Sequence, residues 1–286
     1  MLATVKEATP WWVKIGLKVA LARVPLDYGR WRRLGVFQHG FMLDPEYAQR
    51  TFLRHFDRVR ETLPEAFTVL ELGPGDSLAT ALIAYAHGAR CTWLVDAGAF
   101  AEQDVTAYRK FYDVLGTRVP APAASVEALL ASTGSRYLTR GLASLREIPS
   151  ASVDFVFSQA VLEHVDLAEF DETARELFRV LKPGAVSSHR IDLQDHLAHG
   201  LHSLRFSRDV WEAGWFARRS GFYTNRLRAS EIDAIFRGAG YRVDARIDDC
   251  WPRPPLDRSA IHAEMAHLSD ADLLVRGVDL VASRPR

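Results

Sequence analysis

The sequence predicts an α/β fold built on a mostly parallel sheet. From about residue 65 onward, short apolar runs alternate with segments that repeat at helical spacing. The first apolar run ends in Gly73-Pro74-Gly75, as a buried parallel strand does when it enters a tight loop. The chain has 286 residues, of which 48% are hydrophobic and 25% charged. This is ordinary globular composition, and it allows one large α/β domain or two small ones.

The N-terminal part of the chain differs in character from the rest. It is rich in aromatic residues and arginine, and apolar residues recur there at helical spacing, at Val13, Leu17, Leu21 and Val24. This spacing predicts an amphipathic helix over 11–24, and we expect residues 1–62 to form an N-terminal helical cap segment. Three roles stay open for that helix: a lid over a site, a contact in a homodimer, and an anchor at a membrane surface.

From residue 63 onward the pattern predicts a row of strands separated by helices. The strands are expected at 67–72, 91–95, 137–139, 154–158, 186–193, 241–247 and 277–282. The helices are expected at 77–87, 101–115, 170–181 and 229–239, and the sequence Lys182-Pro183-Gly184 is expected to close the third of them. A polar, histidine-rich stretch interrupts the alternation. We expect it to be a cap insertion at about 194–228 in a domain that spans 63–286.

Charge and cysteine content limit the partners. The 36 basic residues balance the 36 acidic ones, whereas a protein that mainly binds nucleic acid usually carries a basic excess. Two cysteines far apart in sequence, Cys91 and Cys250, cannot build a disulfide framework. No segment is long and apolar enough to span a membrane. We therefore expect a cytoplasmic protein with a small-molecule ligand, no nucleic-acid partner and no integral membrane span.

The ends of the predicted strands are the places to look for a binding site, because parallel sheets bind ligands beyond the carboxyl ends of their strands. After the first strand, Gly73 and Gly75 let the backbone turn sharply and approach a ligand. A dinucleotide fingerprint needs a small residue three positions after Gly75, where Leu78 stands, so a nicotinamide or flavin cofactor is disfavoured. Asp96 ends the second strand, 21 residues after Gly75, and a carboxylate there can accept hydrogen bonds from ribose hydroxyls.

Five short motifs carry a resemblance to a known family. In chain order they are Val69-Leu70-Glu71-Leu72-Gly73-Pro74-Gly75, Leu94-Val95-Asp96, Val153-Asp154-Phe155-Val156-Phe157-Ser158, Val161-Leu162-Glu163-His164-Val165 and Leu181-Lys182-Pro183-Gly184. With these motifs the sequence resembles the class I S-adenosylmethionine-dependent methyltransferases over roughly residues 65–195. The resemblance implies a Rossmann-like, seven-stranded, mostly parallel sheet with helices on both faces and an antiparallel last strand. It also implies S-adenosylmethionine as the cofactor.

The resemblance further implies a set of cofactor-binding residues. They are Glu71, Gly73, Pro74 and Gly75 near the methionine part, Asp96 at the ribose, Ala97 and Leu142 near the adenine, and Ser158 and Gln159 at the methyl-transfer site. Many relatives carry an acid after the third strand, where this sequence reads Arg140-Gly141-Leu142-Ala143. The adenine contact is therefore expected to come from backbone groups.

Catalytic residues are expected at the ends of the fourth and fifth strands. Methyl transfer from a sulfonium mainly requires that donor and acceptor be brought together in line. A hydroxyl acceptor also benefits from a base, and histidine suits that role at neutral pH. The candidates are His164, His189 and Asp192. The alternatives are a polar cluster that satisfies its own hydrogen bonds, or a magnesium ion held by two carboxylates. No zinc spacing is present, and we expect no metal.

A further polar set is expected to contact the acceptor. It consists of Arg190, His196, Tyr223, Asn225 and Arg226. Other arginines could join it and hold a phosphate or carboxylate of the acceptor, namely Arg30, Arg32, Arg33, Arg218, Arg219 and Arg228. The alternative is that arginine stems cover apolar surface and pair with acidic residues.

These expectations favour a small-molecule methyltransferase, with oxygen of a sugar, glycan precursor or secondary metabolite as the acceptor. A nitrogen acceptor stays open, since it needs no strong base. The sequence Ser158-Gln159-Ala160-Val161 is unlike the Asn-Pro-Pro-Tyr type of motif, which disfavours DNA and protein glutamine as targets. The alternative function is a non-methylating enzyme or a non-catalytic partner protein that binds S-adenosylmethionine with the same fold.

Overall fold

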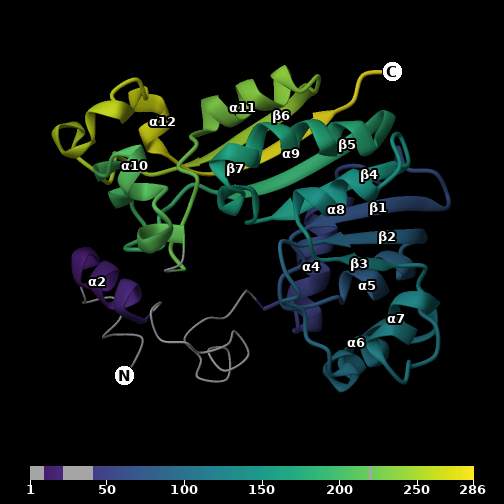
Figure 1. Ribbon diagram of the computed structural model, residues 1–286. Helices are drawn as coiled ribbons and strands as arrows, with labels where there is room; N and C mark the ends of the chain where they lie inside the picture. Colours follow the sequence, from purple (N-terminus) through teal and green to yellow (C-terminus); the bar gives the residue numbers. More distant parts are fainter. Residues whose placement is uncertain (1–9, 22–40, 219–220) are drawn as a thin grey trace.

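The computed structural model describes residues 10–21, 41–218 and 221–286. A twisted sheet carries helices on both faces, and a second group of helices and loops lies beside the end of the sheet where the parallel strands finish (Figure 1). The expectations for Arg30, Arg32, Arg33 and Arg219, and for the last residues of the first helix, fall outside the described residues.

The sheet confirms the predicted fold class. Its strands are β1 Phe67–Leu72, β2 Ala89–Val95, β3 Arg136–Leu138, β4 Val153–Gln159, β5 Leu181–Asp192, β6 Arg242–Cys250 and β7 Val275–Ser283. They lie in the order β3-β2-β1-β4-β5-β7-β6, and β7 is antiparallel to both of its neighbours. The chain runs outward from β1 to β3 on one side and from β4 onward on the other. This reversal opens a crevice at the carboxyl ends of β1 and β4.

The helices cover the sheet in two layers. Their bounds are α2 Trp11–Leu21, α4 Pro45–Phe56, α5 Thr80–Ala86, α6 Arg109–Leu115, α7 Val126–Ser132, α8 Leu142–Glu147, α9 Leu167–Val180, α10 Arg208–Trp211, α11 Ala229–Gly238 and α12 Asp270–Leu274. One apolar core joins α4, α5, α6 and α7 to the sheet, and another joins α8, α9 and α11 to the opposite face. Strand β1 is buried along its whole length, with Val69 in the first core and Leu70 in the second. This two-sided burial explains its continuous apolar sequence.

Strand β5 begins five residues earlier than predicted. The sequence Lys182-Pro183-Gly184 lies within the strand as an irregular stretch, where pairing with β4 passes from Val153↔Leu181 to Phe155↔Val186. Helix α9 has already ended at Val180. The short helices α7, α8, α10 and α12 were not predicted, whereas α5 and α6, of seven residues each, are shorter than the helices expected at 77–87 and 101–115. Segments of seven residues or fewer display little of a helical repeat, so their existence and bounds are poorly defined by spacing.

The predicted N-terminal segment contacts two different parts of the molecule. Helix α4 packs in the same core as β1 and α5, whereas α2 packs against the stretch between β5 and α11. In α2, Ile15 joins an apolar cluster with Trp211 and Phe222, and Trp11 stacks on His202 at 4.9 Å between ring centroids. The stretch between β5 and α11 also shares a core with residues 251–274, which connect β6 to β7. That second insertion was not predicted.

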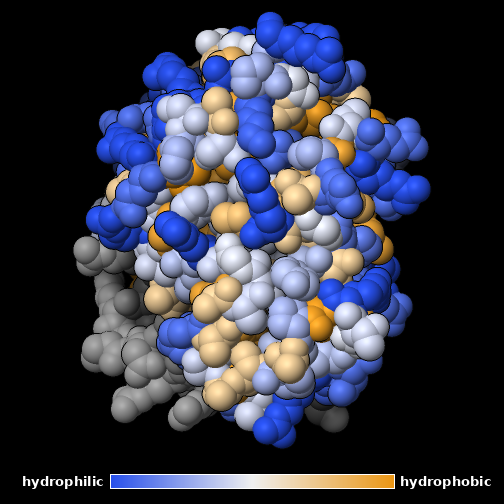
Figure 2. Space-filling model, turned by 90° about the vertical axis from the view of Figure 1, so that its right-hand side faces the viewer, coloured by the Kyte–Doolittle hydropathy of each residue, from blue (hydrophilic) through white to orange (hydrophobic). Residues whose placement is uncertain are grey.

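None of the helices in the described ranges is long and apolar enough to cross a membrane. The end of the molecule where β1 and β4 begin shows a mostly hydrophilic surface in which apolar side chains form small, separated areas (Figure 2). The crevice lies at the opposite end of these strands, so the search for a site begins there.

Candidate cofactor and acceptor site

The glycine loop after β1 holds three segments together. Gly73 has φ +75°, and its amide donates to the Val95 carbonyl oxygen at 2.7 Å. A Cβ atom at Gly73 would lie 2.3 Å from a methyl carbon of Val161, in the loop after β4. Gly75 has φ +65°, and its amide donates to Asp96 Oδ2 at 2.9 Å. Only glycine suits position 73, because both its backbone conformation and its closeness to Val161 exclude a side chain.

Asp96 lies between the loops after β1 and β2. Its carboxylate is buried and accepts from two backbone amides, Gly75 on one oxygen and Ala97 on the other, the latter at 2.7 Å. Burial raises the pKa of Asp96, and the two backbone hydrogen bonds work in the opposite direction. Because each carboxylate oxygen can accept a second hydrogen bond, a diol at this edge still finds acceptors.

Glu71 is a buried carboxyl group at the end of β1. It is 2% exposed, and its Oε2 finds no hydrogen-bond partner among the described residues. Burial raises the pKa of Glu71 to about 8, and the charge of Asp96 adds to this. A buried carboxyl oxygen without a donor is costly, and a ligand that carries a cation or an N–H group would satisfy it. This fits the methionine part of S-adenosylmethionine.

The loop after β3 lies against the loop after β2. The Gly141 amide donates to the Asp96 carbonyl oxygen at 2.8 Å, and a Cβ atom at Gly141 would lie 3.7 Å from Ala97 Cα. Leu142, the next residue, is half-buried, and Ala97 is exposed. These backbone and apolar groups form a surface on which a flat base could rest.

Ser158 and Gln159 end β4 and point to opposite faces of the sheet. Ser158 Oγ lies 2.7 Å from His189 Nδ1, and the other ring nitrogen of His189 is hydrogen-bonded to Ser187. His189 is fully buried and contacts Phe236 edge to face. Burial lowers the pKa of His189 to about 3. These contacts place His189 in the core beneath α11 and do not favour a role as a base.

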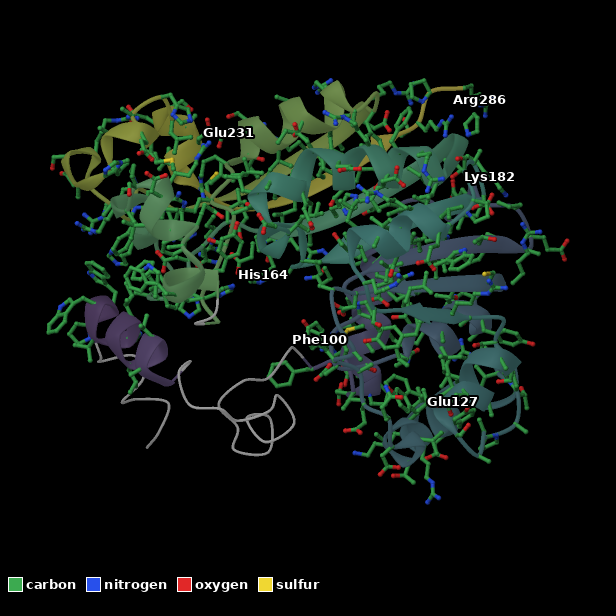
Figure 3. All side chains as sticks on the ribbon, in the orientation of Figure 1. Phe100, Glu127, His164, Lys182, Glu231 and Arg286 are labelled. Atoms are coloured by element: carbon green, nitrogen blue, oxygen red, sulfur yellow. The ribbon has the colours of Figure 1, made fainter. Side chains whose placement is uncertain are left out.

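His164 and His196 lie together at the strand ends (His164 is labelled in Figure 3). Their rings stack with centroids 5.0 Å apart, and the two Nε2 atoms are 3.3 Å apart. His164 Nδ1 lies 3.0 Å from the Tyr223 carbonyl oxygen. Although His164 is exposed, the packing around it partly desolvates the ring and lowers the pKa of His164. The structure therefore brings together His164, His196 and Tyr223.

Asp192 ends β5 near this pair. Its Oδ1 accepts from the backbone amide of Gln194 at 3.0 Å and from the side-chain amide at 3.2 Å. The charge of Asp192 favours the protonated form of His164. Arg190, two residues earlier, is engaged by two acidic residues, Asp249 at 3.3 Å and Asp279 at 3.7 Å.

Asn225 and Arg228 are bound by the chain's own backbone, whereas Arg226 is bound through Nη1 alone and its buried Nε and Nη2 have no hydrogen-bond partner among the described residues. Asn225 Nδ2 donates to the Leu162 carbonyl oxygen at 2.7 Å. Arg226 donates to the Phe206 carbonyl oxygen at 2.8 Å, and Arg228 to the Leu193 carbonyl oxygen at 2.7 Å. Burial lowers the pKa of each arginine to about 10. These side chains tie the insertion to the sheet, and the expected anion site there stays a prediction that only the free donors of Arg226 support.

A hollow of about 270 Å³ lies beside α4 and was missed by the sequence reasoning. Its lining residues are Tyr47, Arg50, Thr51, Arg54 and Gln159. The available signal was the spacing of Arg50, Arg54 and Arg58, four residues apart. In the described ranges no group of three histidine, cysteine or acidic residues is placed to hold a metal ion.

Comparison with known proteins decides the family. Residues 70–187 match the family described as methyltransferase domain, and they contain the glycine loop, Asp96 and Gln159. Residues 70–187 form a class I S-adenosylmethionine-dependent methyltransferase domain. S-adenosylmethionine is therefore its cofactor, and the acceptor is the open question. No protein among the curated sequences matches the chain.

Solved structures similar to this methyltransferase are distant in sequence. A S-adenosylmethionine-dependent methyltransferase from Methanosarcina mazei is 16% identical with a TM-score of 0.47, and 80% of this chain and 97% of that one are covered. One from Mesorhizobium loti is 16% identical with a TM-score of 0.45 and the same coverage of 80% and 97%. The phosphoethanolamine N-methyltransferase 2 of Haemonchus contortus is 15% identical with a TM-score of 0.47, covering 83% and 53%.

Proposed function

We propose that this methyltransferase acts on an oxygen of a small molecule (a sugar, a glycan precursor or a secondary metabolite), with His164 as the general base. The supporting observation is the contact of 3.0 Å between His164 Nδ1 and the Tyr223 carbonyl oxygen. A carbonyl oxygen only accepts, so this contact assigns the proton to Nδ1 and leaves a lone pair on Nε2. The lowered pKa of His164 keeps the ring neutral near pH 7, ready to take a proton.

The cofactor supplies a methyl group that is already activated on a sulfonium. We expect Asp96 to accept hydrogen bonds from its ribose, and Glu71 with the loop Gly73-Pro74-Gly75 to hold its methionine part. Ala97 and Leu142 would border the adenine. At the methyl-transfer site the side chain of Gln159 is available, whereas the Ser158 hydroxyl is committed to His189.

In the proposed reaction the acceptor oxygen bonds to the methyl carbon as the carbon–sulfur bond breaks. The acceptor hydroxyl takes the place of His196 Nε2 beside His164 Nε2, and its proton passes to His164 Nε2 and is later released to water. His196 and Asp192 assist, because a second ring nitrogen lies beside the base and a negative charge favours its protonated form. Proton transfer of this kind contributes about 10²- to 10⁴-fold in rate.

The test is His164→Asn, assayed with hydroxyl and amine acceptors at several pH values. We expect kcat/KM for hydroxyl acceptors to fall about 10²- to 10⁴-fold, with the acidic limb of the pH profile lost. Calorimetric titration with S-adenosylhomocysteine should show unchanged cofactor affinity. The matched control is His267→Asn, an exposed histidine in the 251–274 insertion. Full activity of His164→Asn toward hydroxyl acceptors would exclude the base role.

The same titration, combined with the acceptor assays, distinguishes a methyltransferase from the alternative function. Cofactor binding without methylation of any acceptor class would favour a non-methylating enzyme or a partner protein. A homodimer also stays a prediction, and light scattering on the purified protein will test it. The packing of α2 against the insertion between β5 and α11 is compatible with a lid over the acceptor.

A further inference from the structure

The hollow beside α4 combines positive charge with the methyl-transfer end of β4. Two of its lining residues are arginines, and a third is Gln159, the last residue of β4. Tyr47 and Thr51 complete the lining with an aromatic ring and a hydroxyl group. The hollow therefore lies where a group attached to the acceptor would extend from the reacting atom.

In the ion-pair network that includes Arg54, the guanidinium groups exceed the acidic residues that neutralise them. Asp279 on β7 faces three guanidinium groups, Arg54 at 2.7 Å, Arg58 at 3.6 Å and Arg190 at 3.7 Å. Asp249 is shared between Arg190 and Arg276. Four arginines thus meet two carboxylates. Since a guanidinium has five N–H donors, Arg54 retains donors for a second anion.

Arg50 supplies a second cation, whose side chain can exchange its present partner for another anion at little cost in stability. It pairs with Glu46 at 2.5 Å, one helical turn away, and both side chains are largely exposed at 62% and 82%. An exposed pair of this type contributes little to stability. A ligand anion in the hollow can therefore replace Glu46 as the partner of Arg50.

The polar groups next to the hollow orient Gln159. The Arg58 guanidinium donates to Ser188 Oγ at 3.3 Å, Ser188 Oγ lies 2.9 Å from His55 Nδ1, and His55 Nε2 lies 3.2 Å from Gln159 Oε1. Burial lowers the pKa of His55 to about 4, and the charges of Arg58 and Arg54 add to this. His55 is therefore neutral, and because Gln159 Oε1 only accepts, the ring proton lies on Nε2. Its bond to Oε1 leaves the amide NH₂ of Gln159 as a donor toward the hollow.

We propose that the hollow binds an anionic group of the acceptor, a carboxylate or a phosphate, through Arg54, Arg50 and the Gln159 amide. The proposal rests on the proposed function, because it names the chemical class of that acceptor. It is separate from the anion site that the sequence suggested at Arg226 and Arg228. Arg54 is the principal ligand, since it lines the hollow and its guanidinium is held in place by Asp279.

The experiment measures binding without turnover. Protein saturated with S-adenosylhomocysteine is titrated at constant ionic strength with inorganic phosphate and with acetate, while NMR follows the arginine Nε–H signals. We expect saturable binding of at least one of the two anions, weakened about tenfold or more by Arg54→Gln. The control is Arg60→Gln, an exposed arginine paired with Asp57 just beyond α4, which should change the Kd less than twofold. Thermal melts check that both variants fold.

Two results would overturn the proposal: no saturable binding of either anion, or binding that Arg54→Gln leaves within twofold of the original chain. The anion with the lower Kd, inorganic phosphate or acetate, indicates whether the acceptor carries a phosphate or a carboxylate. The His164→Asn assay tests the proposed function independently of this binding experiment. Anion binding that depends on Arg54 without methylation of hydroxyl acceptors would keep this inference and reject oxygen transfer.

Discussion

Single residues at the strand ends serve both the fold and the site. Gly73 brings the loops after β1 and β4 into contact, and Gly75 turns its amide onto the carboxylate expected to bind ribose. Gln159 is oriented by a histidine that comes from a helix about a hundred residues earlier in the chain. The identity of these residues therefore depends on partners that are distant in sequence.

Gly73→Ala is expected to weaken cofactor binding more than it weakens the fold. The added Cβ meets Val161 and forces the two loops apart, and the positive φ adds about 1–2 kcal/mol of backbone strain. We expect calorimetry to show S-adenosylhomocysteine bound about tenfold or more weakly. Gly116→Ala is the matched control, because Gly116 has φ +58° but open space around its Cβ position. Equal cofactor affinities in the two variants would contradict this account.

Helix α4 shows how one element links the core to the proposed acceptor hollow. Ala48 and Phe52 form a row that packs on the sheet, and Arg50 and Arg54 form a second row two positions later. Two positions correspond to about 200° around a helix, so the rows lie on nearly opposite sides. Any displacement of α4 would move the arginines as well.

The N-cap of α4 stabilises the start of the helix that carries these arginines. Asp44 Oδ1 accepts from the Tyr47 amide at 2.8 Å, and Pro45 follows as the first helical residue. Asp44→Ala should lower the free energy of unfolding by about 1 kcal/mol, measured by urea denaturation. Asp44→Ser retains a capping oxygen and should restore most of it. Equal stability of the two variants would show that the cap contributes nothing.

At the scale of the whole molecule, buried titratable groups set the pH range of stability. Burial raises the pKa of Glu71 and Glu163 to about 8, above the ordinary value of 4.5. Burial lowers the pKa of His55 and His189 to about 4 and about 3, below the ordinary value of 6.5. The carboxyl groups therefore reduce stability as the pH rises from about 4.5 to 8. The histidines reduce it as the pH falls from about 6.5 to 3.

The two effects oppose each other between about pH 4.5 and 6.5, so the cofactor-free protein should melt at the highest temperature there and lower on both sides. Scanning calorimetry from pH 4 to 8.5 measures this. Glu163→Gln should flatten the alkaline side and stabilise the protein at pH 8 by on the order of 1–3 kcal/mol. Both Glu163 oxygens are buried without a hydrogen-bond partner among the described residues. The exposed Glu46→Gln is the control, and an unchanged alkaline slope in Glu163→Gln would reject the assignment.

The α/β class, the seven strands and the cofactor end of the crevice could be predicted from local patterns in the amino-acid sequence. Apolar runs, turn glycines and the acid after β2 are local patterns in the sequence. Because strands that alternate with helices run parallel, their carboxyl ends lie at one edge of the sheet. Helices α7, α8, α10 and α12 and the insertion before β7 could not be predicted, because segments this short display little of a helical repeat and the insertion shows none.

Which polar residues contact one another became evident from the folded chain alone. His189 and Arg228 are of residue types common in binding sites, yet both side chains are buried in the interior. The pleat of β5 directs His189 inward, and packing at the start of α11 buries Arg228. His55 and Arg54 carry no motif, but α4 crosses the sheet and places them beside Gln159 and Asp279. The direction of a side chain depends on which face of a strand or helix it occupies and on what packs there. That information resides in contacts between distant segments, so it appears only when the chain is folded.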